Sequence, residues 1–148
     1  MLTASGIGLG LMIGLSAAGS AIGLSISGQA LMGMLKKRPE AFGIGLVLSA
    51  APSTQGLYGF VAYMLYKSII TPDLTAVQGA VVLAAGIMVG IACLLSAIFQ
   101  GKVCASGLAA FSSGHNVVAQ TLILAAFPEF YAILSLVAAI LMKGLMAA

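Results

Sequence analysis

The sequence has few charged residues and no tryptophan. Charged residues make up 6% of the 148 positions, with six bases against three acids. A soluble domain carries about 25% charged residues, which it needs to cover its surface. Because 61% of the residues are hydrophobic and the mean hydropathy is +1.19, this chain lacks such a surface. The composition excludes a soluble protein and indicates an integral membrane protein.

Cysteine is also scarce, and the positive charge is concentrated in one short stretch. Cys93 and Cys104 share one apolar segment without metal-ligand spacing, so we expect two small, reduced side chains in a helix. The net charge of +3 reflects the neighbouring bases Lys36, Lys37 and Arg38. These bases form a short loop and no extended basic surface, so no nucleic-acid partner is expected.

Long apolar runs fill most of the chain. They cover roughly residues 3–35, 41–70, 76–110 and 117–147. Each run exceeds the ~20 residues that cross a ~30 Å hydrocarbon core. Short polar connections separate the runs, at residues 36–40, 71–75 and 112–116, so consecutive helices are antiparallel. We predict an all-α membrane protein with four transmembrane helices in two duplicated hairpins, residues 1–70 and 71–148.

The positions of the bases predict the orientation in the membrane. Residues 36–38 are all basic and lie on the side of the first and third connections, whereas the other side has only Lys67 and Lys143 near helix ends. The positive-inside rule then places loops 36–40 and 112–116 in the cytoplasm and both termini outside.

The two halves of the chain resemble each other, which indicates an internal duplication. Ser20-Ala21-Ile22 matches Ser96-Ala97-Ile98 at an offset of 76, and Pro52-Ser53-Thr54-Gln55 lies over Ala126-Phe127-Pro128-Glu129 at an offset of 74. This alignment makes Gln55 the counterpart of Glu129. Each lies about fourteen residues, or ~20 Å, beyond its loop and so near the middle of the membrane, and Gln100 reaches a similar depth.

Small residues form two rows in the first apolar run. Gly6, Gly10, Gly14 and Ala18 recur at i,i+4, as do Gly19, Gly23 and Ser27. Such rows let helix backbones approach closely in a bilayer. Rows on two faces predict a helix with tight neighbours on both sides, as in a closed ring of inner helices. A packing face within one compact bundle is the simpler alternative.

Glu129 is an acid within an apolar run. An ionised acid at the centre of a membrane helix costs about 2.5–3.5 kcal/mol, which makes it a candidate functional residue. Thr54, Gln55 and Gln100 supply further oxygens, and Pro52 frees a backbone carbonyl within residues 48–51 because it has no N–H. Pro128 predicts a second local break, just before the acid.

This set of groups points to a cation. A carboxylate, two amide oxygens, a hydroxyl and a carbonyl are the all-oxygen ligands expected for a hard cation. Because the set has a single negative charge, it neutralises a monovalent ion, and we favour Na⁺ over H⁺. The alternative role for the glutamines is to bond one helix to another.

Three motifs in this duplicated chain resemble one family. They are Pro52-Ser53-Thr54-Gln55-Gly56-Leu57-Tyr58-Gly59-Phe60, Phe99-Gln100-Gly101-Lys102-Val103 and Glu129-Phe130-Tyr131-Ala132-Ile133-Leu134. Together they closely resemble the membrane rotor subunit of V-type (A/V-type) ATPases and ATP synthases, the proteolipid or subunit K, and most of all its Na⁺-transporting bacterial branch. The resemblance implies that Na⁺ is bound by Glu129, Gln55, Thr54, Gln100 and the backbone carbonyl of Ala51, with the Tyr58 hydroxyl bonded to Glu129. The chain departs from the family pattern at Ala51, Ser53 and Phe127-Pro128.

The resemblance also implies an assembly in the lipid of the cell (plasma) membrane. About ten subunits close into a rotor ring, with the first and third helices inside. The expected partners are a stator membrane subunit with an arginine and the central stalk of a cytoplasmic ATPase sector. The chain itself is then no enzyme, and it carries Na⁺, or alternatively H⁺ on Glu129, as the ring rotates.

Two other classes of protein remain open. A small four-helix cation or drug exporter can also use one membrane glutamate, although it does not need the duplication. A structural assembly protein would make the shared depth of Gln55, Gln100 and Glu129 coincidental. A large detergent-stable oligomer favours the ring over both.

Overall fold

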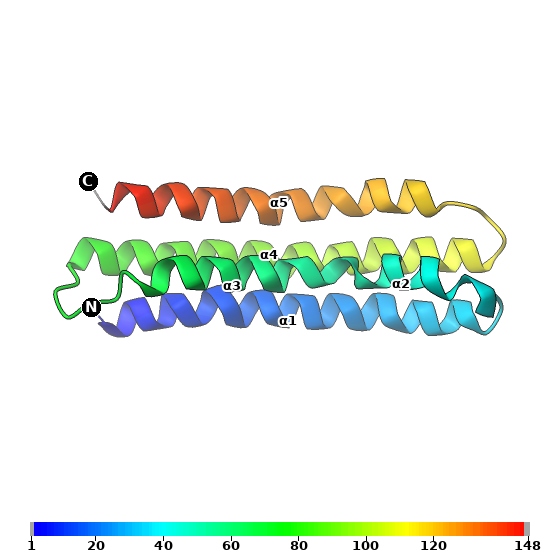
Figure 1. Cartoon of the computed structure of the whole chain (residues 1–148), viewed down its shortest axis with the longest axis horizontal. Helices are drawn as coiled ribbons and strands as arrows, with labels where there is room; N and C mark the ends of the chain where they lie inside the picture. The colour runs from blue at the N-terminus through cyan, green and yellow to red at the C-terminus, as the bar shows by residue number, and fades with distance from the viewer. Residues whose placement is uncertain (1, 147–148) are drawn as a thin grey trace.

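The computed structural model describes residues 2–146, which are almost entirely helical. The elements are α1 (Leu2–Leu35), the 3-10 turn η1 (Pro39–Ala41), α2 (Phe42–Ala50), the 3-10 turn η2 (Ala51–Ser53), α3 (Thr54–Lys67), α4 (Ala76–Ser112) and α5 (Val118–Leu145). They form four antiparallel columns, the second of which consists of α2, η2 and α3 (Figure 1). The predicted all-α class is confirmed, and the predicted end of the last helix at Ala147 lies outside the described residues.

The second predicted run, residues 41–70, is interrupted near Pro52, where the sequence predicts a freed backbone carbonyl. The turn η2 interrupts it, leaving α2 with 9 residues and α3 with 14. Pro52 causes this interruption, because it has no N–H to donate and its ring disturbs the preceding turn. Among the described residues, three helices are individually long and apolar enough to span a membrane: α1, α4 and Val118–Gly144 of α5.

Two serines of α1 compensate for the interruption. Ser27 Oγ donates to the Ser49 carbonyl oxygen at 2.7 Å, and Ser20 Oγ accepts from the Gly56 N–H at 2.8 Å. Backbone groups released by a proline inside a bilayer must find partners within the protein, and neighbouring hydroxyls are common ones. α1 therefore stabilises the broken column on both sides of Pro52.

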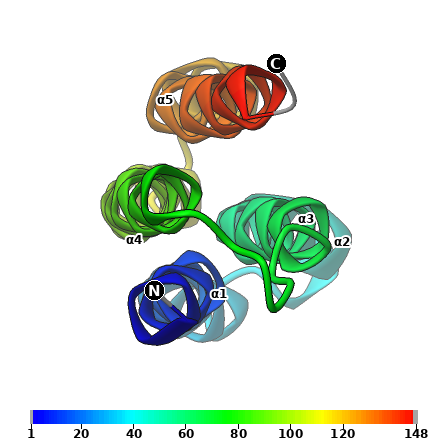
Figure 2. The same cartoon turned by 90° about the vertical axis from the view of Figure 1, so that its left-hand side faces the viewer.

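Glycines allow α1 and α4 to pack closely. A β-carbon on Gly23 would overlap the Ala97 carbonyl oxygen, and one on Gly86 would overlap the backbone of Gly8. Larger residues at these positions would hold the two backbones apart. Figure 2 shows the result end-on: α1 lies beside α4, α5 packs on the far side of α4, and the α2–α3 column lies against both α1 and α4.

The two predicted rows of small residues in α1 have different surroundings. Gly19 and Gly23 face α4, in agreement with a packing role. Gly6, Gly10 and Gly14 have no atom within 4 Å of the position that a β-carbon would take. The row that contains Gly6, Gly10 and Gly14 faces away from the rest of the chain, so the expected tight neighbour on that side stays a prediction.

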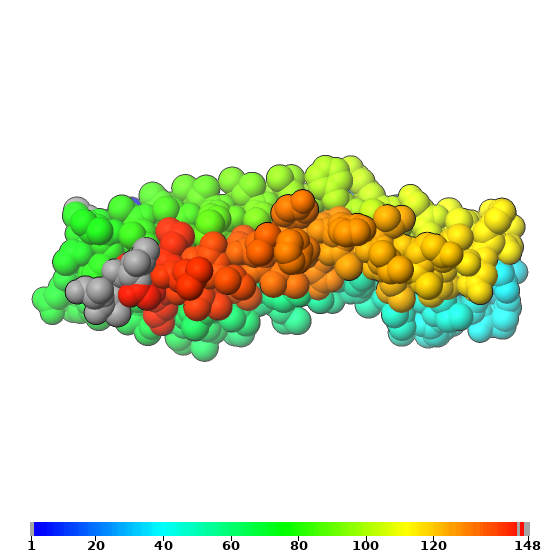
Figure 3. All heavy atoms as spheres, turned by 90° about the horizontal axis from the view of Figure 1, so that it is seen from above, coloured from blue at the N-terminus to red at the C-terminus, as the bar shows by residue number. Residues whose placement is uncertain are grey.

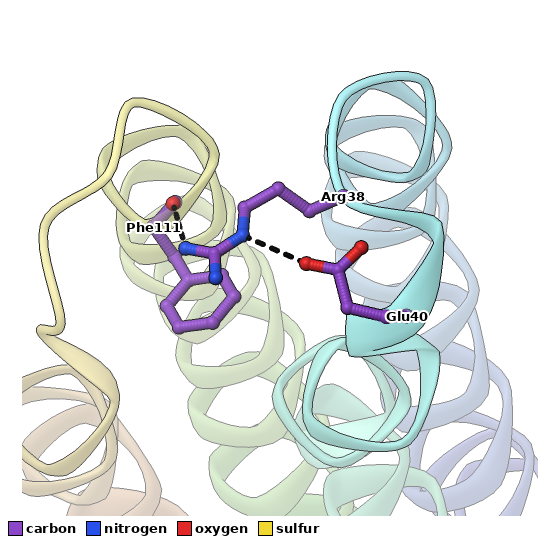
Figure 4. Close-up of polar contacts among 3 residues, drawn as sticks. All are labelled: Arg38, Glu40 and Phe111. Carbon is purple, nitrogen blue, oxygen red and sulfur yellow. Dashed lines mark hydrogen bonds and ion pairs between the residues drawn. The ribbon is translucent and has the colours of Figure 1, made fainter.

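The first and third connections meet at one end of the molecule (Figure 1). The Arg38 guanidinium donates to the Phe111 carbonyl oxygen at 3.5 Å and lies 4.5 Å from the centre of the Phe111 ring. It also pairs with Glu40 at 3.2 Å (Figure 4). A backbone hydrogen bond and the Arg38 guanidinium lower the pKa of the exposed Glu40 carboxyl. Arg38 thus ties the two loops together; the assignment of this end to the cytoplasm stays a prediction.

Candidate ion-binding site

Glu129 lies within α5, about 16 Å from the first residue of the helix at ~1.5 Å per residue. Figure 3 shows α5 lying exposed across one face of the molecule. Pro128 is inside this helix and does not end it, so the break that we expected before the acid is absent. The Pro128 carbonyl oxygen accepts a hydrogen bond from Ser96 Oγ at 2.8 Å, and such contacts with a neighbouring helix allow a proline to remain in a membrane helix.

Two neutral donors hold the Glu129 carboxylate. The Tyr58 hydroxyl donates to Oε1 at 2.8 Å, and Gln100 Nε2 donates to Oε2 at 3.0 Å. Within the described residues 2–146, the salt bridge is the one between Arg38 and Glu40, which lies far from Glu129 at one end of the molecule. The ammonium group of Lys102 lies 5.0 Å from the centre of the Phe99 ring. The charge of an ionised Glu129 therefore has no cationic partner here, and a bound cation or a proton can neutralise it.

The carboxylate fixes the orientation of both glutamine amides. An ionised Glu129 and the Ala125 carbonyl oxygen can only accept, so Gln100 presents Nε2 to them, at 3.0 Å in each case. Gln100 Oε1 then faces Gln55 and accepts from Gln55 Nε2 at 2.8 Å. The nitrogen of the Gln55 amide thus faces Gln100, and its oxygen, Oε1, lies beside Thr54.

Three oxygens of the second column gather at this point. Thr54 Oγ1 is 3.4 Å from the Ala51 carbonyl oxygen and 3.3 Å from Gln55 Oε1. The single hydroxyl proton of Thr54 can serve only one of these acceptors at a time. A cation of the size of Ca²⁺ or Na⁺ holds oxygens at about 2.4 Å, so two ligands at right angles lie about 3.4 Å apart. Each of the two distances is compatible with a shared cation as well as with a hydrogen bond, and η2 places the Ala51 carbonyl beside Thr54.

The structure brings the predicted site residues into one network of close polar contacts. This network contains Ala51, Thr54, Gln55, Tyr58, Gln100 and Glu129. In the described part of the protein, no three His, Cys, Asp or Glu side chains come together as a metal site. A cation at this place thus depends on amide, hydroxyl and carbonyl oxygens with one carboxylate, and the role of each residue as a ligand stays a prediction.

Ser96 is a further member of the network, and the predicted site did not include it. Its hydroxyl accepts from Gln55 Nε2 at 3.0 Å and donates to the Pro128 carbonyl oxygen. Ser96 lies four residues before Gln100, and residues at i,i+4 share one face of a helix. That spacing was the signal in the sequence that could have identified it.

The fold and the site together define a multi-pass membrane protein in which tyrosine and glutamine hold one acid of the last helix. The sequence model of the ATP synthase C-subunit family matches this chain twice, at residues 7–66 and 83–142. The chain is 38% identical to the V-type sodium ATPase subunit K of Enterococcus hirae over 127 residues, which are 86% of this chain and 81% of that protein. It is 35% identical to the A-type ATP synthase subunit K of Methanocaldococcus jannaschii over 136 residues, 92% of this chain and 60% of that protein. The chain belongs to the ATP synthase C-subunit family.

Family membership confirms the class inferred from the three motifs. The protein is a non-catalytic member of the ion-transporting membrane rotor ring of V/A-type ATPases. The exporter and assembly-protein alternatives are therefore set aside. The partition into hairpins at residues 70 and 71 stays a prediction.

The duplication is also confirmed. The two matched segments have equal lengths and begin 76 residues apart. This offset places Pro52 over Pro128, whereas the pairing of Gln55 with Glu129 uses an offset of 74 and stays a prediction.

Proposed function

We propose that this rotor protein carries Na⁺ across the membrane on Glu129. One observation supports this most strongly: the donors that contact the carboxylate in the described residues are neutral, and they share a network with oxygens of Ala51, Thr54 and Gln55. Na⁺ would be cargo, bound by Glu129, Thr54, Gln55, Gln100 and the Ala51 carbonyl, with Tyr58 orienting the carboxylate. The similarity to a protein named as a sodium ATPase subunit agrees with this choice of ion.

The mechanism follows from the charge of the site. When loaded, Glu129 and Na⁺ are neutral together, so the site can pass through lipid as the ring turns. An arginine of the stator subunit would displace the ion and pair with the bare carboxylate until a new ion enters. Each elementary charge moved across the membrane gains or loses about 2.3 kcal/mol per 100 mV. Rotation driven by ATP hydrolysis in the cytoplasmic sector, through the central stalk, would supply this energy.

The assembly is part of the same proposal. About ten copies would form the ring, with α1 and α4 inside and the other two columns outside. The ring would lie in the cell membrane with loops 36–40 and 112–116 in the cytoplasm, facing the central stalk. In mild detergent, the purified protein should then run as one large oligomer; a monomer or dimer would contradict the ring.

Proton transport is the second candidate, because the same carboxylate can take up H⁺. Proton binding needs only Glu129 and one hydrogen-bond acceptor, and it makes no use of the oxygens around Thr54. The gathering of those oxygens beside the amide of Gln55 favours Na⁺.

Carbodiimide labelling distinguishes the two ions, because the reagent modifies a protonated membrane carboxyl. We expect Glu129 to be labelled in the purified ring and millimolar Na⁺ to protect it, whereas choline at the same concentration should not. Mass spectrometry of the labelled peptide locates the modification, and Glu40 serves as an exposed carboxyl for comparison. If Na⁺ gives no protection at any pH, the cargo is H⁺.

A further inference from the structure

Ser96 is a buried polar residue beside the ion site that the proposed ligand set does not use. Its side chain is 5% exposed and lies on α4, one turn before Gln100. It forms two hydrogen bonds to different elements, one from Gln55 in α3 and one to the Pro128 carbonyl in α5. It thus connects the oxygen-rich second column to the helix that carries the acid, without contacting either carboxylate oxygen.

The Ser96 hydroxyl can form both hydrogen bonds only if it donates to one partner and accepts from the other. Its single proton goes to Pro128, because a carbonyl oxygen cannot donate. It must therefore accept from Gln55, which requires the nitrogen end of that amide to face Ser96. Gln100 Oε1 accepts the second N–H of Gln55 Nε2 and therefore favours the same orientation of the Gln55 amide. Two acceptors thus hold the nitrogen end of Gln55 and leave Oε1 for Thr54 and a cation.

We propose that Ser96 is a positioning residue that sets Na⁺ affinity by holding the Gln55 amide with its oxygen toward the ion. This inference rests on the proposed function, since it assumes that Gln55 Oε1 is a Na⁺ ligand. Loss of the hydroxyl leaves one buried N–H of Gln55 without its partner. The amide orientation that points Oε1 toward the ion is then less stable relative to other orientations. Binding of H⁺ to Glu129 uses neither Gln55 oxygen nor Ser96, so it should be insensitive to the change.

Two variants of equal shape isolate the hydroxyl. Ser96→Thr keeps it and Ser96→Val replaces it by a methyl group. Ser96 borders an apolar groove of about 450 Å³ between α4 and α5, which offers room for the added methyl in both variants. Ser135→Ala is the control, because Ser135 is also buried, donates to the Ala132 carbonyl of its own helix and is not among the hydrogen-bond partners of Gln55, Gln100 or Glu129.

The experiment measures carbodiimide labelling of Glu129 in purified rings of each variant, first against Na⁺ concentration at fixed pH and then against pH without Na⁺. For Ser96→Val we expect about a tenfold higher Na⁺ concentration for half-protection, with an unchanged pH profile in the absence of Na⁺. Ser96→Thr and Ser135→Ala should remain close to the unmodified ring.

Two results would overturn the inference. Equal half-protection concentrations for Ser96→Thr and Ser96→Val would show that the hydroxyl has no role in Na⁺ binding. A pH profile that shifts together with the Na⁺ response would show a general loosening around α5. If Ser96→Val forms no ring, Ser96→Ala provides the same comparison. Absence of Na⁺ protection in the unmodified ring would instead reject the proposed function, so the two failures are distinguishable.

Discussion

The bond between Tyr58 and Glu129 allows a quantitative test of the site. The Tyr58 hydroxyl donates to Glu129 Oε1 at 2.8 Å, and both side chains are partly buried. A hydrogen bond to a charged group contributes about 1.5–3 kcal/mol, and we take the lower end because the pair is not fully enclosed. Tyr58→Phe removes this donor and keeps the ring in place, so it should raise the energy of the ionised carboxylate by about 1.5 kcal/mol.

Na⁺ binding requires the ionised carboxylate, so the loss should appear directly in Na⁺ affinity. An energy of about 1.4 kcal/mol corresponds to a factor of ten, and we expect about ten times more Na⁺ for half-protection of Glu129 against carbodiimide. Tyr131→Phe is the matched control, because Tyr131 lies two residues after Glu129 and is 67% exposed. Equal half-protection concentrations for Tyr58→Phe and the unmodified ring would refute the reasoning.

Three further predictions concern the acid, the helix packing and the loops. Glu129→Gln should abolish ATP-driven Na⁺ uptake by vesicles that contain the complete complex while the ring still assembles; uptake that persists would contradict the role of Glu129. Gly23→Val should lower thermal stability in detergent by about 1–3 kcal/mol, because its side chain would overlap Ala97 and Pro52, whereas Gly43→Val should not, since a β-carbon there has no atom within 4 Å. Arg38→Ala should raise the lowered pKa of Glu40 part of the way toward its ordinary value of 4.5. Because this pKa is lowered in the folded protein, the contribution of Glu40 to stability is present above 4.5 and is lost as the pH falls through the lowered value. A carbon-13 NMR titration of Glu40 measures that shift, and an unchanged midpoint would show that Arg38 has no effect.

Much of the fold could be predicted from the sequence, because a bilayer imposes simple requirements on helix length. The apolar run that starts at Ala76 begins a helix in the structure as well, and the run that ends at Leu35 ends one. The effects of the two prolines could not be separated in this way. Pro52 interrupts its column and Pro128 does not, although the two prolines lie 76 residues apart, as do the starts of the two family matches. Near both prolines the backbone finds serine partners on a neighbouring helix, and such contacts between helices cannot be predicted from one sequence.

Most residues of the candidate site could be predicted from the sequence, whereas the hydrogen bonds between them could not. Glu129, Gln55 and Gln100 stand out because polar side chains are costly in an apolar run. The orientation of the two amides follows from acceptors such as the Ala125 carbonyl, which are backbone atoms and leave no signal in the sequence. Ser96 was not predicted for a related reason. Serines in membrane helices often donate to a backbone carbonyl of their own helix, so a serine alone does not indicate a contact with another helix.

If Glu129 carries Na⁺, each chain of the ring binds one Na⁺ ion. Equilibrium binding of radioactive ²²Na⁺ to the purified ring measures this number, with the Glu129→Gln ring as the control. We expect saturable binding of one ion per chain that H⁺ displaces as the pH falls and that is lost in Glu129→Gln. An unmodified ring that binds no more Na⁺ than the Glu129→Gln ring would contradict the claim.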